Sequence, residues 1–204
     1  KQIQEIEESI KGMIQHTVEL NNQIDSSLLS GVKVVVNDKV IDVGCDHALL
    51  DIYLVKNNIV NSIIVSDVSK NAIDAGIKNI QKYEVDERID ARCGNGLEVL
   101  NESDNVDTVI ISGMGTHTII DILKSHYSKL NKIHTIIIQS NTKIDTLRTE
   151  IVKLNYFIDD EELVQDKKKI YTIIKFKKGT KKYTKKELFF GPVFLSVESP
   201  PMRP

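Results

Sequence analysis

The stretch Val40-Ile41-Asp42-Val43-Gly44-Cys45-Asp46-His47 is an apolar run that breaks on a glycine between carboxylates. A second apolar run, Ile63-Ile64-Val65-Ser66, ends on an acid, Asp67, roughly 20 positions further on. In an open parallel sheet, a strand that ends on glycine lets a nucleotide approach the backbone. An acid at the end of the next strand then accepts hydrogen bonds from ribose hydroxyls. The two runs predict a nucleotide-binding fold and favour an enzyme.

The glycine loop indicates which nucleotide is bound. A dinucleotide site needs three glycines so that a helix N-terminus meets a pyrophosphate, and this loop has only Gly44. Asp42 and Asp46 would repel a phosphate, whereas they suit a ligand that carries an ammonium and a sulfonium. The pattern therefore points to S-adenosylmethionine. The alternative is a strand-to-helix turn without a ligand, in which Asp46 caps the helix.

Two further apolar runs end in the same way. Residues 89–93 lead into Gly94-Asn95-Gly96, and residues 107–112 lead into Gly113-Met114-Gly115. Ligands bind outside the carboxyl ends of parallel strands, so four such ends in succession predict one site. The Asn95 amide suits an adenine edge, although Asn-Gly is also common in plain turns.

Strand and helix patterns alternate along the chain, which predicts a Rossmann-like, doubly wound α/β sheet of about seven strands. The late runs 156–164 and 170–176 are joined so tightly, at Asp166-Lys167, that they must be antiparallel. A mostly parallel sheet with a terminal antiparallel β-hairpin favours a methyltransferase over a dehydrogenase. The other expected strands are 39–43, 62–67, 88–93, 106–112 and 134–139, and the expected helices are 48–56, 70–83, 118–124 and 144–154.

The first 25 residues have a different pattern, with apolar or small side chains at steps of three and four. They predict an N-terminal helix with one apolar seam, which packs on its own domain or pairs with another helix or a second protomer. The expected organisation is a helical segment over residues 1–30, an α/β domain over 31–195 and a tail over 196–204. The seam residues are Ile3, Ile6, Ile10, Met13, Thr17, Leu20 and Ile24.

The composition indicates the cellular compartment and the classes of binding partner. Cys45 and Cys93 are the only cysteines, and there is no signal sequence, membrane-spanning stretch or disulfide framework, so we expect a cytoplasmic protein without a membrane or metal site. The net charge is −2, yet residues 167–186 hold ten lysines and no acid, which leaves 17 basic against 29 acidic residues elsewhere. This block is either an electrostatic footprint for nucleic acid or a solvated hairpin.

Several segments together resemble the bacterial tRNA (adenine(22)-N1)-methyltransferase family over about residues 38–195. The unusual part is the Asp46-His47 pair combined with Gly113-Met114-Gly115. The segments are Val40 through Leu50, Gly94-Asn95-Gly96-Leu97, Ile111-Ser112-Gly113-Met114-Gly115, Ile137-Ile138-Gln139-Ser140-Asn141, Glu162-Leu163 with Ile170-Tyr171, and Phe189-Phe190-Gly191-Pro192.

The resemblance implies a class I methyltransferase domain that uses S-adenosylmethionine to methylate N1 of an adenine in tRNA. It also implies roles by position. Asp42, Gly44 and Asp46 would border the methionine end of the cofactor, and Asp67 with Val68 would border its ribose. Asn95 with Gly96 would border the adenine ring, and Gly113, Met114 and Gly115 would face the sulfonium and the incoming base. Gln139 with Asn141 would line the substrate side.

The chain departs from the family pattern at four positions. It has Asn95 in place of Asp, Thr116 in place of a second glycine, and Ser140 and Asp51 in place of prolines. Asn95 keeps an acceptor, so we expect cofactor binding to survive. The family also has a helical extension beyond the Gly-Pro segment, which we expect to be missing or shortened because the chain stops at Pro204.

Adenine N1 has an in-plane lone pair, so its methylation requires mainly alignment and no prior deprotonation. We expect Asp46 and Asn141 to hold the exocyclic amine and the developing positive charge, and His47 to contact the base or a phosphate. The base must be unpaired, because N1 lies on the pairing edge. Recognition would then rest on the tRNA backbone, with Lys177, Lys178, Lys181 and Lys182 as the expected phosphate contacts.

Two other functions remain open from the sequence. The first is a methyltransferase whose acceptor is a protein or a small metabolite. The second is a non-catalytic member of the fold that binds RNA or a partner helix, which Asn95, Thr116 and Ser140 make conceivable. Against the second reading stand Gly44, Asp67 and the Gly-Met-Gly run, which a site without a ligand has no reason to keep.

Overall fold

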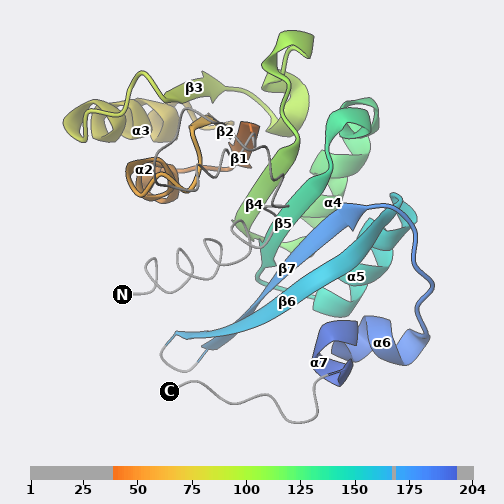
Figure 1. Cartoon of the computed structure of the whole chain (residues 1–204). Helices are drawn as coiled ribbons and strands as arrows, with labels where there is room; N and C mark the ends of the chain where they lie inside the picture. Colours follow the sequence, from red (N-terminus) through yellow and green to blue (C-terminus); the bar gives the residue numbers. More distant parts are fainter. Residues whose placement is uncertain (1–38, 167–168, 197–204) are drawn as a thin grey trace, which may run out of the picture.

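The computed structural model describes residues 39–166 and 169–196, and within them seven strands form one sheet in the order β3-β2-β1-β4-β5-β7-β6 (Figure 1). The first five strands are parallel, and β7 pairs antiparallel with both β5 and β6. The predicted fold class is therefore confirmed. The strands are β1 (Lys39–Val43), β2 (Ser62–Asp67), β3 (Ile89–Cys93), β4 (Thr108–Met114), β5 (Thr135–Ser140), β6 (Tyr156–Asp166) and β7 (Lys169–Lys178).

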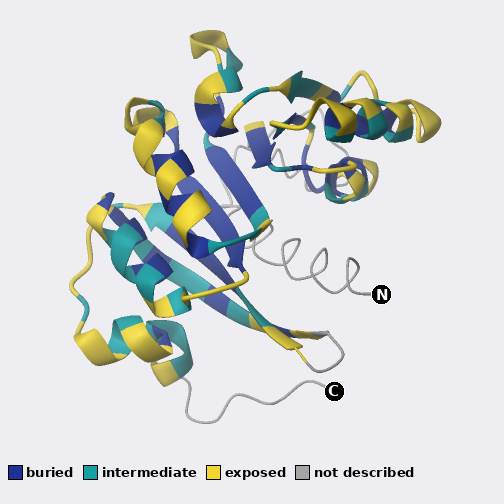
Figure 2. Ribbon diagram, turned by 180° about the vertical axis from the view of Figure 1, so that it is seen from behind, coloured by how far each residue is buried: buried dark blue, intermediate teal, exposed yellow. Residues whose placement is uncertain are grey.

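The helices cover both faces of this sheet. One apolar cluster joins α2 and α3 to one face, and a second joins α4 and α5 to the other. Figure 2 shows the central strands as buried and the outer sides of the helices as exposed. The helices are α2 (Leu49–Lys56), α3 (Lys70–Lys82), η1 (Gly96–Val99), η2 (Glu102–Asp104), α4 (Thr116–Ser125), η3 (Tyr127–Lys132), α5 (Ile144–Lys153), α6 (Lys185–Phe190) and α7 (Pro192–Ser196).

The register of β7 fixes the direction of the terminal hairpin. Ser140, at the end of β5, pairs with Thr172, whereas Thr135, at the start of β5, pairs with Lys177. The strand β7 therefore runs from the carboxyl end of the parallel strands towards their amino end. The chain therefore leaves the sheet at the amino end, after Lys178.

The short helices α6 and α7 were not predicted from the sequence. A buried ion pair joins Arg148 Nε to Glu161 Oε1 at 2.6 Å, and Arg148 Nη1 also donates to the carbonyls of Leu188 and Phe189. The turn between the two helices needs Gly191, because its φ is +97° and a Cβ there would lie 2.7 Å from Glu161 Oε2. The Phe-Phe-Gly-Pro run is thus explained by the way the C-terminal helices dock on α5 and β6.

Some predictions fall on residues that the structure does not describe. The N-terminal helix, with its seam over residues 3–24, lies outside the described residues, as do Lys167 of the hairpin turn and residues 197–204 of the tail. The division into domains stays a prediction. Among the described elements, α4 begins at Thr116, two residues before the expected start.

Candidate active site

The carboxyl ends of β1 to β5 lie along one edge of the sheet, and the loops that follow them form what we call the carboxyl edge: residues 44–48, 67–69, 94–96, 113–116 and 140–143. The first loop is held by Ser66, whose carbonyl accepts from the backbone N–H groups of Gly44 and Cys45 at 2.7 and 3.1 Å. Gly44, Asp46 and Ala48 have φ values of +81°, +48° and +56°. Such strained backbone is concentrated at functional sites, which makes this loop the first candidate for ligand binding.

Asp67 follows β2 and lies beside the glycine loop. Its Oδ1 accepts from the Ser69 N–H at 2.8 Å and its Oδ2 accepts from the Asp46 N–H at 3.3 Å. Each carboxylate oxygen has a further lone pair, so this half-buried group retains acceptors for a pair of hydroxyls. Val68 is 70% exposed next to it and offers an apolar surface at the same edge.

The third loop brings the predicted adenine contacts to the same edge. The Asn95 N–H donates to Glu98 Oε1 at 2.6 Å, and the exposed Asn95 opens the turn η1. Gly96 is buried, and a Cβ on it would lie 2.7 Å from Ile122, so this glycine serves packing. Its carbonyl is 3.4 Å from Ser66 Oγ, which ties the third loop to the first two.

Gly113 has the most open surroundings of these glycines. Its φ is +77°, and a Cβ built on it would have no atom of the described residues within 4 Å. By contrast, a Cβ on Gly44 would overlap the methyl group of Met114. Gly113 therefore borders open space, while Met114 packs on Gly44 and connects the ends of β4 and β1.

Gln139 and Asn141 form a closed hydrogen-bond ring with the backbone of Gly113. The Gly113 N–H donates to Gln139 Oε1 at 2.8 Å, Gln139 Nε2 donates to Asn141 Oδ1 at 3.0 Å, and Asn141 Nδ2 donates to the Gly113 carbonyl at 2.7 Å. Gln139 is buried and Asn141 is exposed. The sequence placed both on the substrate side, but it gave no sign of this ring.

Beneath the glycine loop lies a pair of buried carboxyl groups, Asp42 on β1 and Asp51 on α2. As two carboxylates neither could donate to the other, and Asp42 Oδ1 and both oxygens of Asp51 would lack a partner among the described residues. Burial raises the pKa of Asp42 to about 7, and burial together with the charge of Asp42 raises the pKa of Asp51 well above its ordinary value. A shared proton or a cation is therefore needed to satisfy this pair.

The two predicted catalytic residues of the first loop contact each other. His47 Nδ1 lies 2.7 Å from Asp46 Oδ2, and both side chains are more than half exposed. Helix α2 is entered through Ala48 without a side-chain cap, so the alternative reading of Asp46 as a helix cap is not what the structure shows. The Asp46 carboxylate is available to a ligand or to His47.

The predicted RNA-binding lysines lie at the other end of the sheet. Lys178 Nζ donates to the carbonyls of Leu130 and Asn131 at 2.8 and 2.7 Å, and Lys177 Nζ is 3.3 Å from Asp159. Lys181 and Lys182 are exposed beyond them. A six-residue strand such as β5 separates them from the carboxyl edge by about 17 Å.

A lysine and a histidine to which the sequence assigned no role lie at the carboxyl edge instead. Lys143, after β5, is exposed with a φ of +48°, and its Nζ lies 3.2 Å from Nε2 of His117 on α4. Neither residue has a pattern that separates it from ordinary surface positions. His117 follows Gly115 by two residues in the sequence, whereas only the fold brings Lys143 beside it.

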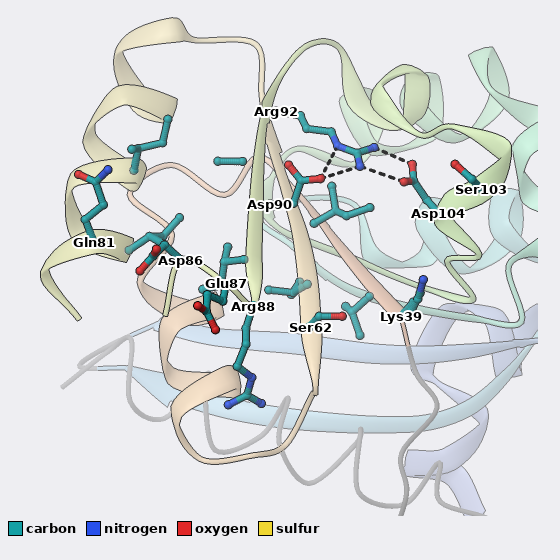
Figure 3. A pocket seen from close by; sticks show the side chains of 17 residues that line it. Lys39, Ser62, Gln81, Asp86, Glu87, Arg88, Asp90, Arg92, Ser103 and Asp104 are labelled. Atoms are coloured by element: carbon teal, nitrogen blue, oxygen red, sulfur yellow. Dashed lines mark hydrogen bonds and ion pairs between the residues drawn. The ribbon is translucent and has the colours of Figure 1, made fainter. Parts of the chain in front are cut away.

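A pocket of about 470 Å³ surrounds the edge strand β3, away from these loops (Figure 3). Its two arginines are already bound: Arg92 contacts Asp90 and Asp104 at 2.6 Å each, and Arg88 donates to the carbonyls of Asn61 and Val60. Its remaining lining is mostly aliphatic. We assign the pocket to packing at the edge of the sheet.

The residues of the carboxyl edge fit S-adenosylmethionine. Gly113 leaves open space, Asp67 keeps acceptors for ribose hydroxyls, and the buried pair of Asp42 and Asp51 beneath the glycine loop needs a shared proton or a cation such as an ammonium. In the described part of the chain, no cluster of three His, Cys, Asp or Glu side chains has the geometry of a metal site. The helices of that same part are all too short or too polar to cross a membrane.

Comparison with known proteins agrees with this geometry. The pattern of the family described as "TrmK: tRNA (adenine(22)-N(1))-methyltransferase" matches residues 40–203. The chain is 34% identical, over 77% of its length and 71% of the other's, to MG248 of Mycoplasma genitalium, which carries a provisional tRNA-methyltransferase name.

Solved structures are similar over the same region. The M. capricolum TrmK in complex with S-adenosyl-homocysteine is 35% identical, with a TM-score of 0.69 over 76% of this chain and 70% of that one. A Streptococcus pneumoniae protein, Sp1610, in complex with S-adenosyl-L-methionine is 31% identical, with a TM-score of 0.74 over 77% and 73%.

A second family pattern, the ATP synthase delta (OSCP) subunit, matches residues 1–53. The described part of that match is β1, the glycine loop and the start of α2, which belong to the sheet above. We attach no function to this match.

Proposed function

The chain belongs to the tRNA (adenine(22)-N(1))-methyltransferase family, and we propose that it methylates N1 of adenine 22 in tRNA with S-adenosylmethionine bound at the carboxyl edge. The observation that carries the proposal is the open space at Gly113, between the acceptors of Asp67 and the amides of Gln139 and Asn141. A cofactor on one side and a base on the other would meet there.

We assign the cofactor contacts to the first four loops. Asp42, Gly44 and Asp46 border the methionine end, and Asp67 with Val68 holds the ribose. Asn95 with Gly96 meets the adenine ring, and Gly113, Met114 and Gly115 face the sulfonium. These roles rest on the fit of the side chains described above and on the family membership. When bound, the cofactor supplies an electrophilic methyl group on a positively charged sulfur.

The protein's own contribution is alignment and electrostatics. Adenine N1 attacks through a lone pair, so the site needs no base to remove a proton before the transfer. Product formation leaves a positive charge on the adenine, which the exposed Asp46 carboxylate stabilises more strongly in the transition state than in the ground state. His47, paired to Asp46, contacts the base or a phosphate, and Asn141 holds the base on the acceptor side.

The tRNA contacts that we propose start at the carboxyl edge. Lys143 and His117 lie next to Gly113 to Gly115 and reach phosphates near the methylated base, while Lys181 and Lys182 contact the tRNA further away. Lys177 and Lys178 belong to the same basic surface, but their ammonium groups also hold Asp159 and the end of η3. A tRNA-modifying enzyme works where tRNA is, which places the protein in the cytoplasm.

The test is a product assay. The full chain is incubated with labelled S-adenosylmethionine and unmodified bacterial tRNA, and the RNA is digested to nucleosides. Label in N1-methyladenosine, mapped to position 22 and lost in Asp46→Ala, is expected. Label at another position changes the target; label in no nucleoside, with cofactor binding intact, excludes tRNA and leaves a protein or small-molecule acceptor.

A further inference from the structure

The hydrogen-bond ring of Gly113, Gln139 and Asn141 has a property that the fold alone does not require: it fixes which end of each amide points where. The Gly113 N–H can only donate, so it must face an oxygen of Gln139, and the Gly113 carbonyl can only accept, so it must face the nitrogen of Asn141. The middle bond, from Gln139 Nε2 to Asn141 Oδ1, agrees with both assignments. Flipping either amide would break at least one bond of the ring.

The ring leaves part of the hydrogen-bonding capacity of Asn141 unused. An amide side chain has two N–H donors and two acceptor lone pairs, and the ring uses one of each on Asn141. No other described residue bonds the Asn141 side chain, whose backbone N–H donates to the Met114 carbonyl. The exposed Asn141 thus retains one donor and one acceptor, held beside the open space at Gly113.

The free donor and acceptor of Asn141 match one edge of adenine when the ring uses the N–H and the lone pair that flank Cβ, because the shared O–N edge of the amide then stays open to a ligand. An Asn side chain pairs in a bidentate way with N7, which accepts, and with the N6 amino group, which donates. That edge does not include N1. A base held by its N7 and N6 therefore keeps N1 free to react.

We infer that Asn141, oriented by Gln139 and Gly113, reads the N7 and N6 edge of the target adenine and so selects adenine over guanine. Guanine has acceptors at both N7 and O6, so its O6 would face the Asn141 oxygen. The inference rests on the proposed function and adds to it the means by which the base is chosen. Gln139 acts through Asn141 and is a positioning residue.

The decisive experiment changes one atom of the substrate. Synthetic tRNAs carry adenine, 7-deazaadenine or 3-deazaadenine at the methylated position, and kcat/KM is measured for each with the wild-type chain. Loss of the N7 acceptor is expected to lower kcat/KM about tenfold, since a bidentate pair is worth about 1–3 kcal/mol. Loss of N3, which lies on the other side of the purine, is the control for the change in N1 reactivity that loss of a ring nitrogen causes, and its effect on kcat/KM is expected to be the same in the wild type and in Asn141→Ala.

The variants then assign the effect to the ring. In Asn141→Ala the activity on adenine falls, and the penalty for 7-deazaadenine disappears because nothing is left to bond N7. Gln139→Glu keeps an acceptor for Gly113 but cannot donate to Asn141, so the penalty shrinks there too. A general structural defect would lower activity on both substrates and keep the ratio. Asn57→Ala, an exposed amide at the end of α2, is the control expected to keep the full penalty.

The outcomes are distinct. Equal kcat/KM for adenine and 7-deazaadenine with the wild-type chain overturns the inference without any variant and leaves the proposed function intact. An unchanged penalty in Asn141→Ala overturns it as well. A chain that methylates no tRNA adenine removes the proposed function and the inference together. Cofactor affinity, measured by calorimetry, is expected to be the same in all of these variants.

Discussion

Thr116 Oγ1 lies 2.8 Å from Ser140 Oγ, and these buried hydroxyls occupy two of the positions at which the chain departs from the family pattern. Thr116 is the first residue of α4 and Ser140 is the last residue of β5. The bond therefore joins the loop that contains Gly113 to the loop that contains Asn141. Either hydroxyl can be the donor in the pair, and both also reach the Thr142 carbonyl. The resemblance described above implies a glycine and a proline at these positions, where this chain has two side chains that bond to each other.

This pair predicts coupled stabilities. Thr116→Val and Ser140→Ala each remove one hydroxyl from a buried site and are expected to destabilise the fold by about 1–2 kcal/mol. The double variant is expected to lose less than the sum, by about 0.5–1.5 kcal/mol, because each single variant leaves the other hydroxyl without its partner. Denaturant unfolding of the four proteins measures this difference. Strict additivity would show that the two hydroxyls do not depend on each other.

The buried carboxyl pair predicts an unusual dependence of stability on pH. Because the pKa of Asp42 rises from 3.8 to about 7, the native state holds more protons than the unfolded chain between those values. The contribution of the pair to the free energy of unfolding therefore falls as pH rises through that window. Asp51→Asn removes one charge and supplies an amide donor to Asp42. The variant is expected to gain about 1–2 kcal/mol more, relative to wild type, at pH 8 than at pH 5.

Thermal or denaturant unfolding at the two pH values measures this gain. Asp74→Asn, on the exposed side of α3, is the matched control and is expected to show no such difference. The same gain for Asp51→Asn at pH 5 and pH 8 would mean that Asp42 is ionised throughout. In that case the pair does not share a proton.

Some features of the site were predictable from the sequence and others were not. The strands and their carboxyl ends were predictable because buried parallel strands are continuous apolar runs that end on Gly44, Asp67 and Gly113. The ring around Gly113 was not, because it depends on two loops 26 residues apart meeting at bond length. Asp51 was noted only as a departure from the family, since a carboxylate in a helix normally indicates an exposed position.

For the lysines, the sequence shows the residues but does not show where they lie on the molecule. A charge block is visible in the sequence, but its place on the molecule depends on the direction of β7, which comes from tertiary pairing. That direction puts Lys177, Lys178, Lys181 and Lys182 at the amino end of the parallel strands. Lys143, which stands apart from the charge block in the sequence, lies at the carboxyl edge beside His117.

The glycines at the site predict different effects of the same substitution. Gly44→Ala and Gly113→Ala both place an L side chain at positive φ, which costs about 1 kcal/mol or more. Only Gly44→Ala adds an overlap with Met114, so it is expected to be clearly less stable than Gly113→Ala. The new methyl of Gly113→Ala meets no atom within 4 Å in residues 39–166 and 169–196, and it projects into the space assigned to ligands.

Gly113→Ala is therefore expected to keep most of its stability and to lose at least tenfold in kcat/KM, about 1.4 kcal/mol in transition-state binding. The control is Gly179→Ala, at a φ of +141° beyond β7, which is expected to be active. Thermal unfolding and tRNA methylation assays separate the two effects. Full activity of Gly113→Ala would show that neither the cofactor nor the base approaches this glycine.

The separation of the lysines predicts two kinds of tRNA-binding defect. Lys143→Glu places a negative charge beside Gly113 to Gly115, and we expect a higher KM, a lower kcat and a salt dependence of tRNA affinity that is less steep by about one phosphate contact. The double variant Lys181→Glu and Lys182→Glu is expected to flatten the salt dependence and weaken tRNA binding while leaving kcat unchanged. Lys178 is unsuitable for this comparison, because its bonds to two carbonyls make its loss a stability defect.

Titrations of tRNA at several salt concentrations, together with calorimetric binding of S-adenosylmethionine, measure these effects. Cofactor affinity is expected to be the same in every lysine variant, because no described lysine bonds Asp67 or the glycine loop. If the double variant binds tRNA with wild-type affinity and salt dependence, the lysine block is a solvated hairpin end. If Lys143→Glu changes affinity but not kcat, the lysine holds the tRNA without aligning the base.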